Sequence, residues 1–237
     1  MIDKATLQAN FTALEARLVA ACAKAQRPRT AVSLIAVSKL HPPELIRFAW
    51  ELGHRDFGEN YAQELRDKHA GLADCVGIRW HAIGPVQPKN AKYVAKAATV
   101  FHALERLDVA QELNKRRTKG PGADGVGSES GTPLQCLIEV NVAGEESKAG
   151  LPPAEVAALV SAVRALPQLE LVGLTAMPPQ YEDPERARPH FKLLRELAGQ
   201  HGLAQLSMGT TTDFGVAIEE GATMVRVGTA LFGERPP

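Results

Sequence analysis

Eight short, mostly apolar runs alternate with longer amphipathic runs along this chain of 237 residues. The short runs have the length of strands, and the longer runs have the period of helices. Parallel strands need crossover connections, usually helices, so this alternation predicts a parallel sheet. Eight such units in a chain of this length are typical of a closed (β/α)8 TIM barrel. A doubly wound open sheet is the alternative, because two of the predicted strands are short.

The predicted elements follow one another with little chain between them. The strands are predicted at 33–37, 55–57, 78–83, 98–101, 134–140, 169–175, 204–207 and 223–227. The helices are predicted at 43–52, 60–70, 88–97, 105–117, 153–165, 185–199 and 212–220. An extra N-terminal helix is predicted at 4–26, where leucine and phenylalanine recur at helical spacing. Residues 120–131 are rich in glycine and serine and predict a flexible surface loop within one domain, 1–237.

Charge and cysteine content exclude several classes of protein. Acidic and basic residues number 27 each, so no net field favours nucleic acid or an anionic membrane. Cys22, Cys75 and Cys136 are odd in number and far apart, which argues against disulfides and a zinc site and indicates a reducing cytoplasm. No apolar stretch approaches ~20 residues, and the N-terminus lacks the apolar centre of a signal peptide, so no membrane span or leader is predicted.

The segments after the seventh and eighth predicted strands have the composition of a phosphate site. In α/β barrels the functional side chains lie at the carboxyl ends of the strands, and phosphate often binds after strands seven and eight. Gly209 and Gly228 allow a close approach of the backbone to an anion, and Ser207 and Thr229 supply hydroxyls. Thr211 either joins them or caps the next helix. Together the two loops favour a phosphate site over ordinary turns.

Lys39 follows the first predicted strand, which lies beside the eighth in a closed barrel. A buried lysine amine is more nucleophilic toward an aldehyde, so a lysine beside a phosphate suits a phospho-sugar aldolase or a pyridoxal phosphate (PLP) protein. Arg226 favours the second class, because a cation there can face the pyridine nitrogen of PLP. A salt bridge in the barrel mouth is an equally compatible interpretation of Arg226.

Seven segments together resemble the pyridoxal phosphate homeostasis protein family. They are 36–39, 57–64, 80–87, 146–150, 173–178, 207–209 and 225–233, in the same order as in the family. The resemblance implies a barrel like the N-terminal domain of fold-type III PLP enzymes such as alanine racemase. Two positions depart from the family: Lys89 and Asn90 are exchanged, and Thr210-Thr211 replaces Met-Ser, although Thr211 keeps a hydroxyl.

The resemblance also implies roles for single residues. Lys39 would hold PLP as a Schiff base and Arg226 would face the pyridine nitrogen. Asn60 and His81 would line the ring pocket. Ser207, Gly228 and Thr229 would hold the phosphate, with Gly209 and Thr211 beside them. No metal ligand and no catalytic residue is implied.

The implied role is PLP homeostasis, in which a cytoplasmic monomer buffers the cofactor or carries it to apo forms of PLP-dependent enzymes. No catalytic reaction is implied, and neither nucleic acid nor membrane is an implied partner. A racemase-like enzyme of fold type III is the alternative. It needs a second acid or base, and of Tyr61, Tyr93 and Tyr181 only Tyr61 is predicted near the site. A class I-type aldolase would instead carry a reactive lysine without a bound chromophore.

Overall fold

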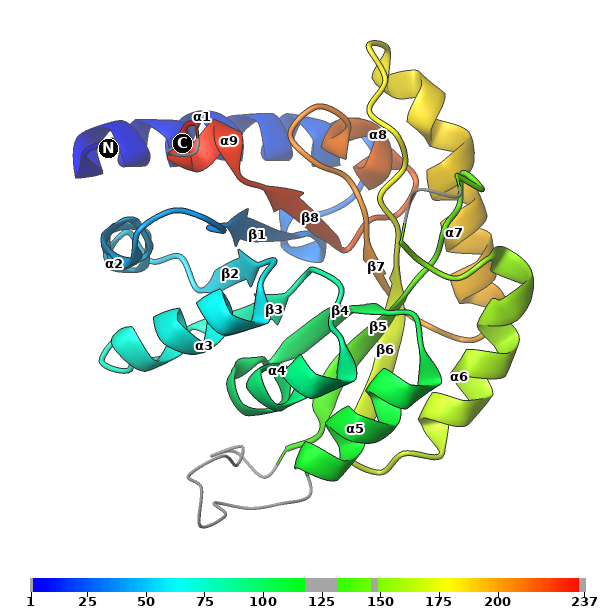
Figure 1. The fold of residues 1–237 in the computed structure, drawn as a ribbon. Coiled ribbons are helices and arrows are strands. Elements are labelled where there is room, and N and C mark those ends of the chain that lie inside the picture. The colour runs from blue at the N-terminus through cyan, green and yellow to red at the C-terminus, as the bar shows by residue number, and fades with distance from the viewer. Residues whose placement is uncertain (1, 118–131, 146–148, 235–237) are drawn as a thin grey trace.

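The strands of the described chain close into one parallel barrel (Figure 1). The computed structural model describes residues 2–117, 132–145 and 149–234. β1 pairs with β2 on one side and with β8 on the other, so the sheet has no open edge. The predicted (β/α)8 barrel is confirmed, and the open-sheet alternative is wrong. The strands are Ser33–Val37 (β1), Asp56–Glu59 (β2), Arg79–Ala82 (β3), Val100–Leu104 (β4), Leu134–Glu139 (β5), Leu169–Thr175 (β6), Gln205–Ser207 (β7) and Met224–Val227 (β8).

Helices surround the outside of the barrel and cover the apolar faces of its strands (Figure 1). They are Lys4–Lys24 (α1), Pro43–Glu51 (α2), Ala62–Gly71 (α3), Ala91–Ala97 (α4), Leu107–Arg117 (α5), Val156–Arg164 (α6), Arg188–Gln200 (α7), Phe214–Glu219 (α8) and Thr229–Phe232 (α9). Three predicted helices start late, because Pro88, Pro153 and Pro184 each open a 3-10 turn before the α-helix begins. The sequence did not predict α9, since its 4 residues are too short to show a period.

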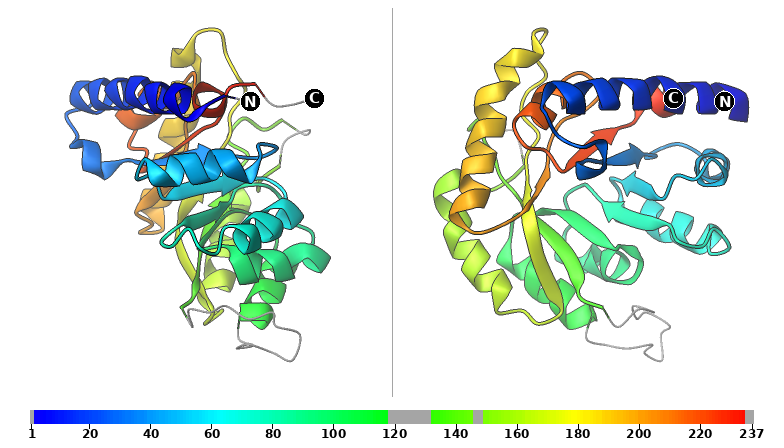
Figure 2. Two further views of the ribbon diagram at one scale, coloured as in Figure 1. Left: turned by 90° about the vertical axis from the view of Figure 1, so that its left-hand side faces the viewer. Right: turned by 180° about the vertical axis from the view of Figure 1, so that it is seen from behind.

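The extra N-terminal helix α1 is confirmed, and it lies across the last two βα units of the barrel (Figure 2). Its apolar stripe is buried against α2, α8 and α9. Arg17 Nη2 donates to the carbonyl oxygen of Thr211 at 3.0 Å, and Asn10 Nδ2 donates to that of Leu231 at 2.8 Å. α1 therefore fixes the loop after β7 and the helix after β8.

A small group of apolar side chains fills one layer of the barrel interior. Ile35, Val100, Leu137 and Met224 form a cluster apart from the main core, which lies between the strands and the helices. Barrel interiors are filled in such layers. Other positions inside the barrel carry the polar side chains described below.

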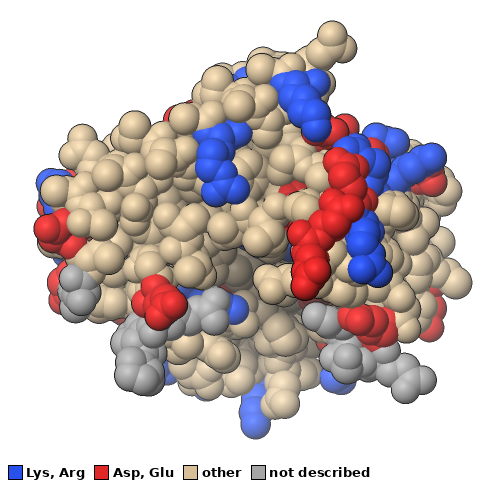
Figure 3. All heavy atoms as spheres, turned by 90° about the horizontal axis from the view of Figure 1, so that it is seen from above, with Lys and Arg blue, Asp and Glu red and all other residues tan. Residues whose placement is uncertain are grey.

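The molecular surface carries charges of both signs. On the side where α1 lies, basic and acidic side chains are close neighbours along one edge (Figure 3). No helix in the described ranges is both long and apolar enough to cross a membrane. The loop predicted at 120–131, and residues 146–148 of one family-like segment, lie outside the described residues.

Candidate functional site

The carboxyl ends of β1 and β8 meet at the mouth of the barrel. The two strands are hydrogen-bonded neighbours. Gly228, directly after β8, lies so close to Val37 that an added Cβ would be 3.1 Å from the Val37 carbonyl oxygen. Lys39 follows Val37 by two residues, and Thr229 follows Gly228. The structure therefore brings the loop that carries Lys39 next to one of the two predicted phosphate loops.

A buried ionic cluster, here called the Lys68 cluster, holds the segment after β1 in place. Lys68 Nζ donates to the carbonyl oxygen of Ser38 at 2.7 Å, to Glu59 Oε1 at 2.8 Å and to Glu64 Oε1 at 2.7 Å. Ser38 Oγ donates to Glu59 Oε1 at 2.6 Å. The Leu40 N–H donates to Glu64 Oε1 at 2.7 Å. Ser38 and Leu40, the residues on either side of Lys39, are thus both bonded to members of the Lys68 cluster.

The segment after β1 is also strained. Leu40 has a φ of 63°, a left-handed conformation that costs a residue with a Cβ about 1–2 kcal/mol. Burial raises the pKa of Glu59 to about 7, although the Lys68 charge and hydrogen bond oppose this rise. Strain and a buried ionisable group are both common at functional sites. The sequence analysis missed this cluster. A signal was present, because Lys68 lies on the buried face of α3 with Leu65.

Arg226 is buried beneath the mouth and fixed to the barrel wall. Its Nη1 donates to Thr175 Oγ1 at 2.9 Å, and to the carbonyl oxygen and Oγ of Ser207 at 2.7 and 2.5 Å. Its Nη2 donates to the carbonyl oxygen of Ala176 at 2.9 Å. Burial lowers the pKa of Arg226, opposed by the charge of Glu139, yet an arginine stays protonated in proteins. The site therefore contains a permanent cation in a fixed orientation.

Ser207 and His81 do not lie as the sequence suggested. The Ser207 hydroxyl is fully buried and bonds Arg226 and His102, so it faces the barrel interior rather than the phosphate loops. His81 bonds Asp56 and His102 and lines a cavity of about 510 Å³ at the amino ends of the strands. It is therefore not at the mouth with Lys39. The sequence placed Ser207 and His81 in or at the end of a predicted strand, but it did not show toward which end of the barrel their side chains point.

The other predicted residues follow the carboxyl ends of their strands. Gly209 and Arg226 line one cavity of about 260 Å³ between the loops after β6 and β7. Thr211 follows Gly209 by two residues and is half-buried. Asn60 follows β2, and its carbonyl oxygen would lie 2.3 Å from a Cβ added to Gly84 in the next loop. Gly209 and Thr211 thus follow β7, and Gly228 and Thr229 follow β8 at the start of α9.

We expect Gly209→Ala to abolish binding of inorganic phosphate or sulfate at this mouth and to lower the free energy of unfolding by about 1–3 kcal/mol. Gly209 has a φ of 93°, and an added Cβ would lie 2.6 Å from the Cβ of Ala217. Calorimetric titration with phosphate and urea unfolding provide the two measurements. Gly199→Ala is the matched control, because an added Cβ there meets nothing within 4 Å. Unchanged phosphate affinity in a folded Gly209→Ala protein would contradict the assignment of this loop.

Glu139, which the sequence analysis also missed, ends β5 near Arg226. Burial raises its pKa to about 7, against the attraction of Arg226, and its Oε2 has no hydrogen-bond partner. The folded protein therefore binds this proton more tightly than the unfolded chain does. The stabilisation from that proton is complete below the ordinary pKa of 4.5 and is lost as the pH rises through about 7.

We therefore expect Glu139→Gln to raise the free energy of unfolding by about 2 kcal/mol at pH ~8, with little effect at pH ~5. Urea unfolding of the variant and the wild type at both values measures this difference. Glu196→Gln, at a side chain that is 53% exposed, is the control and should show no such change. An equal effect of Glu139→Gln at both values would refute the raised pKa.

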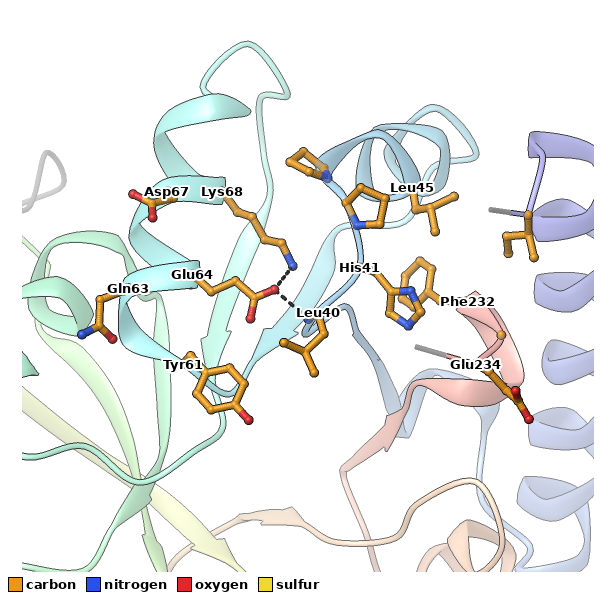
Figure 4. Close-up of a pocket in the computed structure, with 14 residues that line it drawn as sticks. Leu40, His41, Leu45, Tyr61, Gln63, Glu64, Asp67, Lys68, Phe232 and Glu234 are labelled. Carbon is orange, nitrogen blue, oxygen red and sulfur yellow. Dashed lines mark hydrogen bonds and ion pairs between the residues drawn. The ribbon is translucent and has the colours of Figure 1, made fainter. Parts of the chain in front are cut away.

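An apolar groove of about 1270 Å³ lies beside the mouth, between α2, α3 and α9 (Figure 4). Figure 4 shows Glu64 at its wall, bonded to both Lys68 and the backbone of Leu40. The side chains of Leu40 and Tyr61 line the groove and are 46% and 51% exposed. Met177, in the loop after β6, is 53% exposed. The rim of the site is therefore open to solvent and partly apolar.

Comparison with known proteins identifies the family. The family model for the alanine racemase N-terminal domain matches residues 2–236. A pyridoxal phosphate homeostasis protein of Pseudomonas aeruginosa is 43% identical over 234 residues, which cover 97% of this chain and 96% of the relative. One of Aquifex aeolicus is 40% identical over 225 residues, 92% of this chain and 94% of the relative. The chain belongs to the pyridoxal phosphate homeostasis protein family.

Solved structures agree with this family. PipY of Synechococcus elongatus, solved with PLP bound, is 32% identical and superposes with a TM-score of 0.74 over 92% of this chain and 100% of PipY. A protein from Bifidobacterium adolescentis is 29% identical, with a TM-score of 0.85 over 98% of both chains. Alanine racemase from Corynebacterium glutamicum is only 17% identical, and this chain covers 62% of it at a TM-score of 0.65, so it shares the fold.

Proposed function

We propose that this protein binds pyridoxal 5′-phosphate at the mouth of a single barrel domain, residues 1–237, and serves PLP homeostasis. The observation that carries the proposal is the buried Arg226, held by Thr175, Ser207 and Ala176 beneath two glycine-containing loops. Membership of a family whose relatives are named pyridoxal phosphate homeostasis proteins supports it. PipY, solved with PLP bound, supports it further.

The residues present at the mouth fit the cofactor. A Cβ at Gly209 would collide with Ala217, and one at Gly228 would crowd Val37, so both loops pack too closely for a larger residue and leave their backbone bare at the mouth. In this proposal Gly209, Gly228 and Thr229 bind the phosphate, and Thr211 adds its hydroxyl. Asn60 lies beside the ring. Ser207 supports Arg226 instead of the phosphate, and His81 is left out of the ring pocket.

When bound, PLP supplies an aldehyde carbon that amines attack and a pyridine ring that withdraws electrons. Lys39 would hold the aldehyde carbon through its amine, and the Lys68 cluster holds the backbone on both sides of Lys39. Arg226 would donate an N–H toward the ring nitrogen and so keep that nitrogen from taking up a proton. A protonated ring nitrogen withdraws electrons more strongly, so Arg226 disfavours carbanion chemistry.

A cofactor buffer or carrier without a defined reaction fits these features. A carrier must release its cofactor, and the exposed Leu40, Tyr61 and Met177 leave the mouth accessible. An enzyme would need an acid or base near the ring and shielding from water. In this proposal the protein is a cytoplasmic monomer that supplies apo forms of PLP-dependent enzymes. The three cysteines are buried free thiols, which is consistent with a reducing compartment.

A racemase-like activity is the second candidate, and Tyr61 is the observation that favours it. Tyr61 follows Asn60 at the rim and is 51% exposed. The Tyr181 hydroxyl bonds His190, and the Tyr93 ring packs against Arg66, so neither of these tyrosines is offered to the mouth. Tyr61 is thus the tyrosine that this activity would require as its second acid or base.

The experiment follows both transfer and proton exchange. The PLP-loaded protein is mixed with an apo-transaminase, and the recovered transaminase activity reports transfer. The same protein is incubated with each alanine enantiomer in deuterated water, and NMR follows loss of the α-proton. We expect transfer with negligible exchange. Exchange at about 1 per second or faster, abolished by Tyr61→Phe, would replace the carrier by the racemase.

A further inference from the structure

A continuous chain of hydrogen bonds runs through the interior of the barrel and ends on Arg226. Arg226 Nη1 lies 2.5 Å from Ser207 Oγ, which lies 2.9 Å from His102 Nδ1. His102 Nε2 lies 2.9 Å from His81 Nδ1, and His81 Nε2 lies 2.9 Å from Asp56 Oδ1. We call these five side chains the barrel relay. All of them are buried.

The relay spans the barrel from one end to the other. β4, which carries His102, and β7, which carries Ser207, are not neighbours in the barrel, so their bond crosses the interior. Asp56 and His81 line the cavity of about 510 Å³ at the amino ends of the strands. Arg79, with a side chain 57% exposed, also pairs with Asp56 there. The relay therefore has an acidic end near solvent and a cationic end beneath the mouth.

The donors and acceptors allow one arrangement of hydrogens when both histidines are neutral. Arg226 can only donate, so Ser207 Oγ accepts from it. Burial raises the pKa of Asp56, but hydrogen bonds from His81 and Arg79 outweigh this and hold it below its usual value, so its carboxylate accepts.

The two histidines complete that arrangement. Burial, together with the charge of Arg226, holds the pKa of His102 well below its usual value, so His102 carries one ring proton. A neutral His81 places its own proton on Nε2, facing Asp56, and accepts at Nδ1. His102 must then be protonated on Nε2 and must accept from the Ser207 hydroxyl at Nδ1. With both histidines neutral, every hydrogen bond points from Arg226 toward Asp56.

We infer that the barrel relay positions Arg226 and couples its charge to a carboxylate at the opposite end of the barrel. Buried polar groups cost stability unless they are paired, and the adjoining layer of Ile35, Val100, Leu137 and Met224 fills the same interior with apolar groups. Hydrogen bonds that point one way strengthen one another in a low dielectric. A chain of hydrogen bonds that all point the same way and end on the Asp56 carboxylate stabilises the buried guanidinium of Arg226. Among the described residues, the hydrogen-bond partners of this guanidinium are hydroxyl and carbonyl oxygens and include no carboxylate.

Other charged groups face the two ends of the relay. At the acidic end, His54 Nε2 lies 2.8 Å from the carbonyl oxygen of Asp56. At the cationic end, Glu139 and Asp213 act on Arg226 through space. These groups change the electrostatic potential at the two ends of the relay, and the relay is the hydrogen-bonded connection between Asp56 and Arg226. The consequence for a bound cofactor rests on the proposed function, because only there does Arg226 face a ring nitrogen.

The first test uses the ligand-free protein and does not depend on the cofactor. Two-dimensional 1H–15N NMR reads the tautomer of each histidine, and we expect His102 and His81 to be protonated on Nε2 with bare Nδ1. Asp56→Asn should shift the ring nitrogen signals of His102, although His81 stands between them. Ser33→Ala, at a residue that lines the same cavity, is the matched control and should leave them unchanged. A His102 protonated on Nδ1, or one that does not respond to Asp56→Asn, overturns the relay.

The second test addresses the positioning role. Ser207→Ala should weaken PLP binding about tenfold, as expected for loss of a hydrogen bond to a charged group, and should shift the absorption maximum of the bound cofactor. Ser33→Ala should change neither property, and Asp56→Asn should shift the maximum in the same direction if Ser207→Ala folds poorly. Unchanged affinity and spectrum in both variants would overturn the positioning role. A wild-type protein that binds no PLP would refute the proposed function, and the tautomers would still decide the relay.

Discussion

Lys39→Ala should remove the visible absorbance that PLP gives with the wild-type protein and the adduct that borohydride traps, while the fold is retained. The amine of Lys39 is the proposed attachment point, and the neighbouring Lys68 amine is buried and donates to Ser38, Glu59 and Glu64. The backbone bonds of Ser38 and Leu40 to the Lys68 cluster do not involve the Lys39 side chain, so the loop keeps its support. Absorbance spectra and mass spectrometry of the trapped peptide measure the effect.

Lys192→Ala is the control for this variant, because Lys192 is exposed on α7 and pairs loosely with Glu196. Its spectrum and its adduct should match those of the wild type. An adduct found mainly on Lys89 or Lys148 would refute the assignment of Lys39. Residual phosphate binding by Lys39→Ala is expected, since the loops around Gly209 and Gly228 are unchanged.

Replacing Lys68 by alanine should lower the free energy of unfolding by about 3–5 kcal/mol, because it leaves the buried carboxylate of Glu59 and the half-buried one of Glu64 without their cation. Glu59 and Glu64 each have one buried oxygen without a partner even in the intact cluster. The pKa of Glu59 is already raised to about 7, so its ionised form is the less stable one when folded. The loss should therefore grow as the pH rises through neutrality. Urea unfolding at several pH values measures it.

Two further variants separate a buried charge effect from simple loss of a side chain. Lys68→Met combined with Glu59→Gln removes one charge of each sign and should recover part of the stability. Lys192→Ala breaks an exposed pair and should cost less than about 0.5 kcal/mol. A Lys68→Ala protein as stable as the wild type would show that the cluster does not stabilise the segment after β1.

The barrel could be predicted from the sequence because its strands are separate apolar runs with helices between them. Val100–Leu104 shows the limit of this signal. The strand was predicted at 98–101, so His102, which lies in the centre of the observed strand, was left outside it and not recognised as a polar residue that must find a partner inside the barrel. That partner, Ser207, is 105 residues away along the chain. Such pairings depend on closure of the barrel, which local patterns do not encode.

The candidate site was predicted only in part, for the same reason. The placement of Lys39, Gly209, Arg226 and Gly228 follows from a topological rule, since the ends of parallel strands share one edge. The direction of a side chain within a barrel depends on its contacts in the folded protein, which the sequence does not show. Ser207 was therefore assigned to the phosphate, although its hydroxyl contacts Arg226 and His102. The Lys68 cluster was missed because its members come from β2, α3 and the segment after β1. Only the position of Lys68 on the buried face of α3 could have indicated it.

Closure of the barrel also sets the order in which a nascent chain can acquire the site. β1 pairs with β8, and α1 bonds the loop after β7 and the helix after β8, so the earliest and latest segments to be synthesised meet at the mouth. Contacts of such long sequence separation form late and slowly in folding. A ribosome-bound chain that stops before β8 has Lys39 but neither Arg226 nor Gly228. At the proposed site the cofactor would therefore be captured only after translation of the whole barrel, too late to guide the early steps of folding.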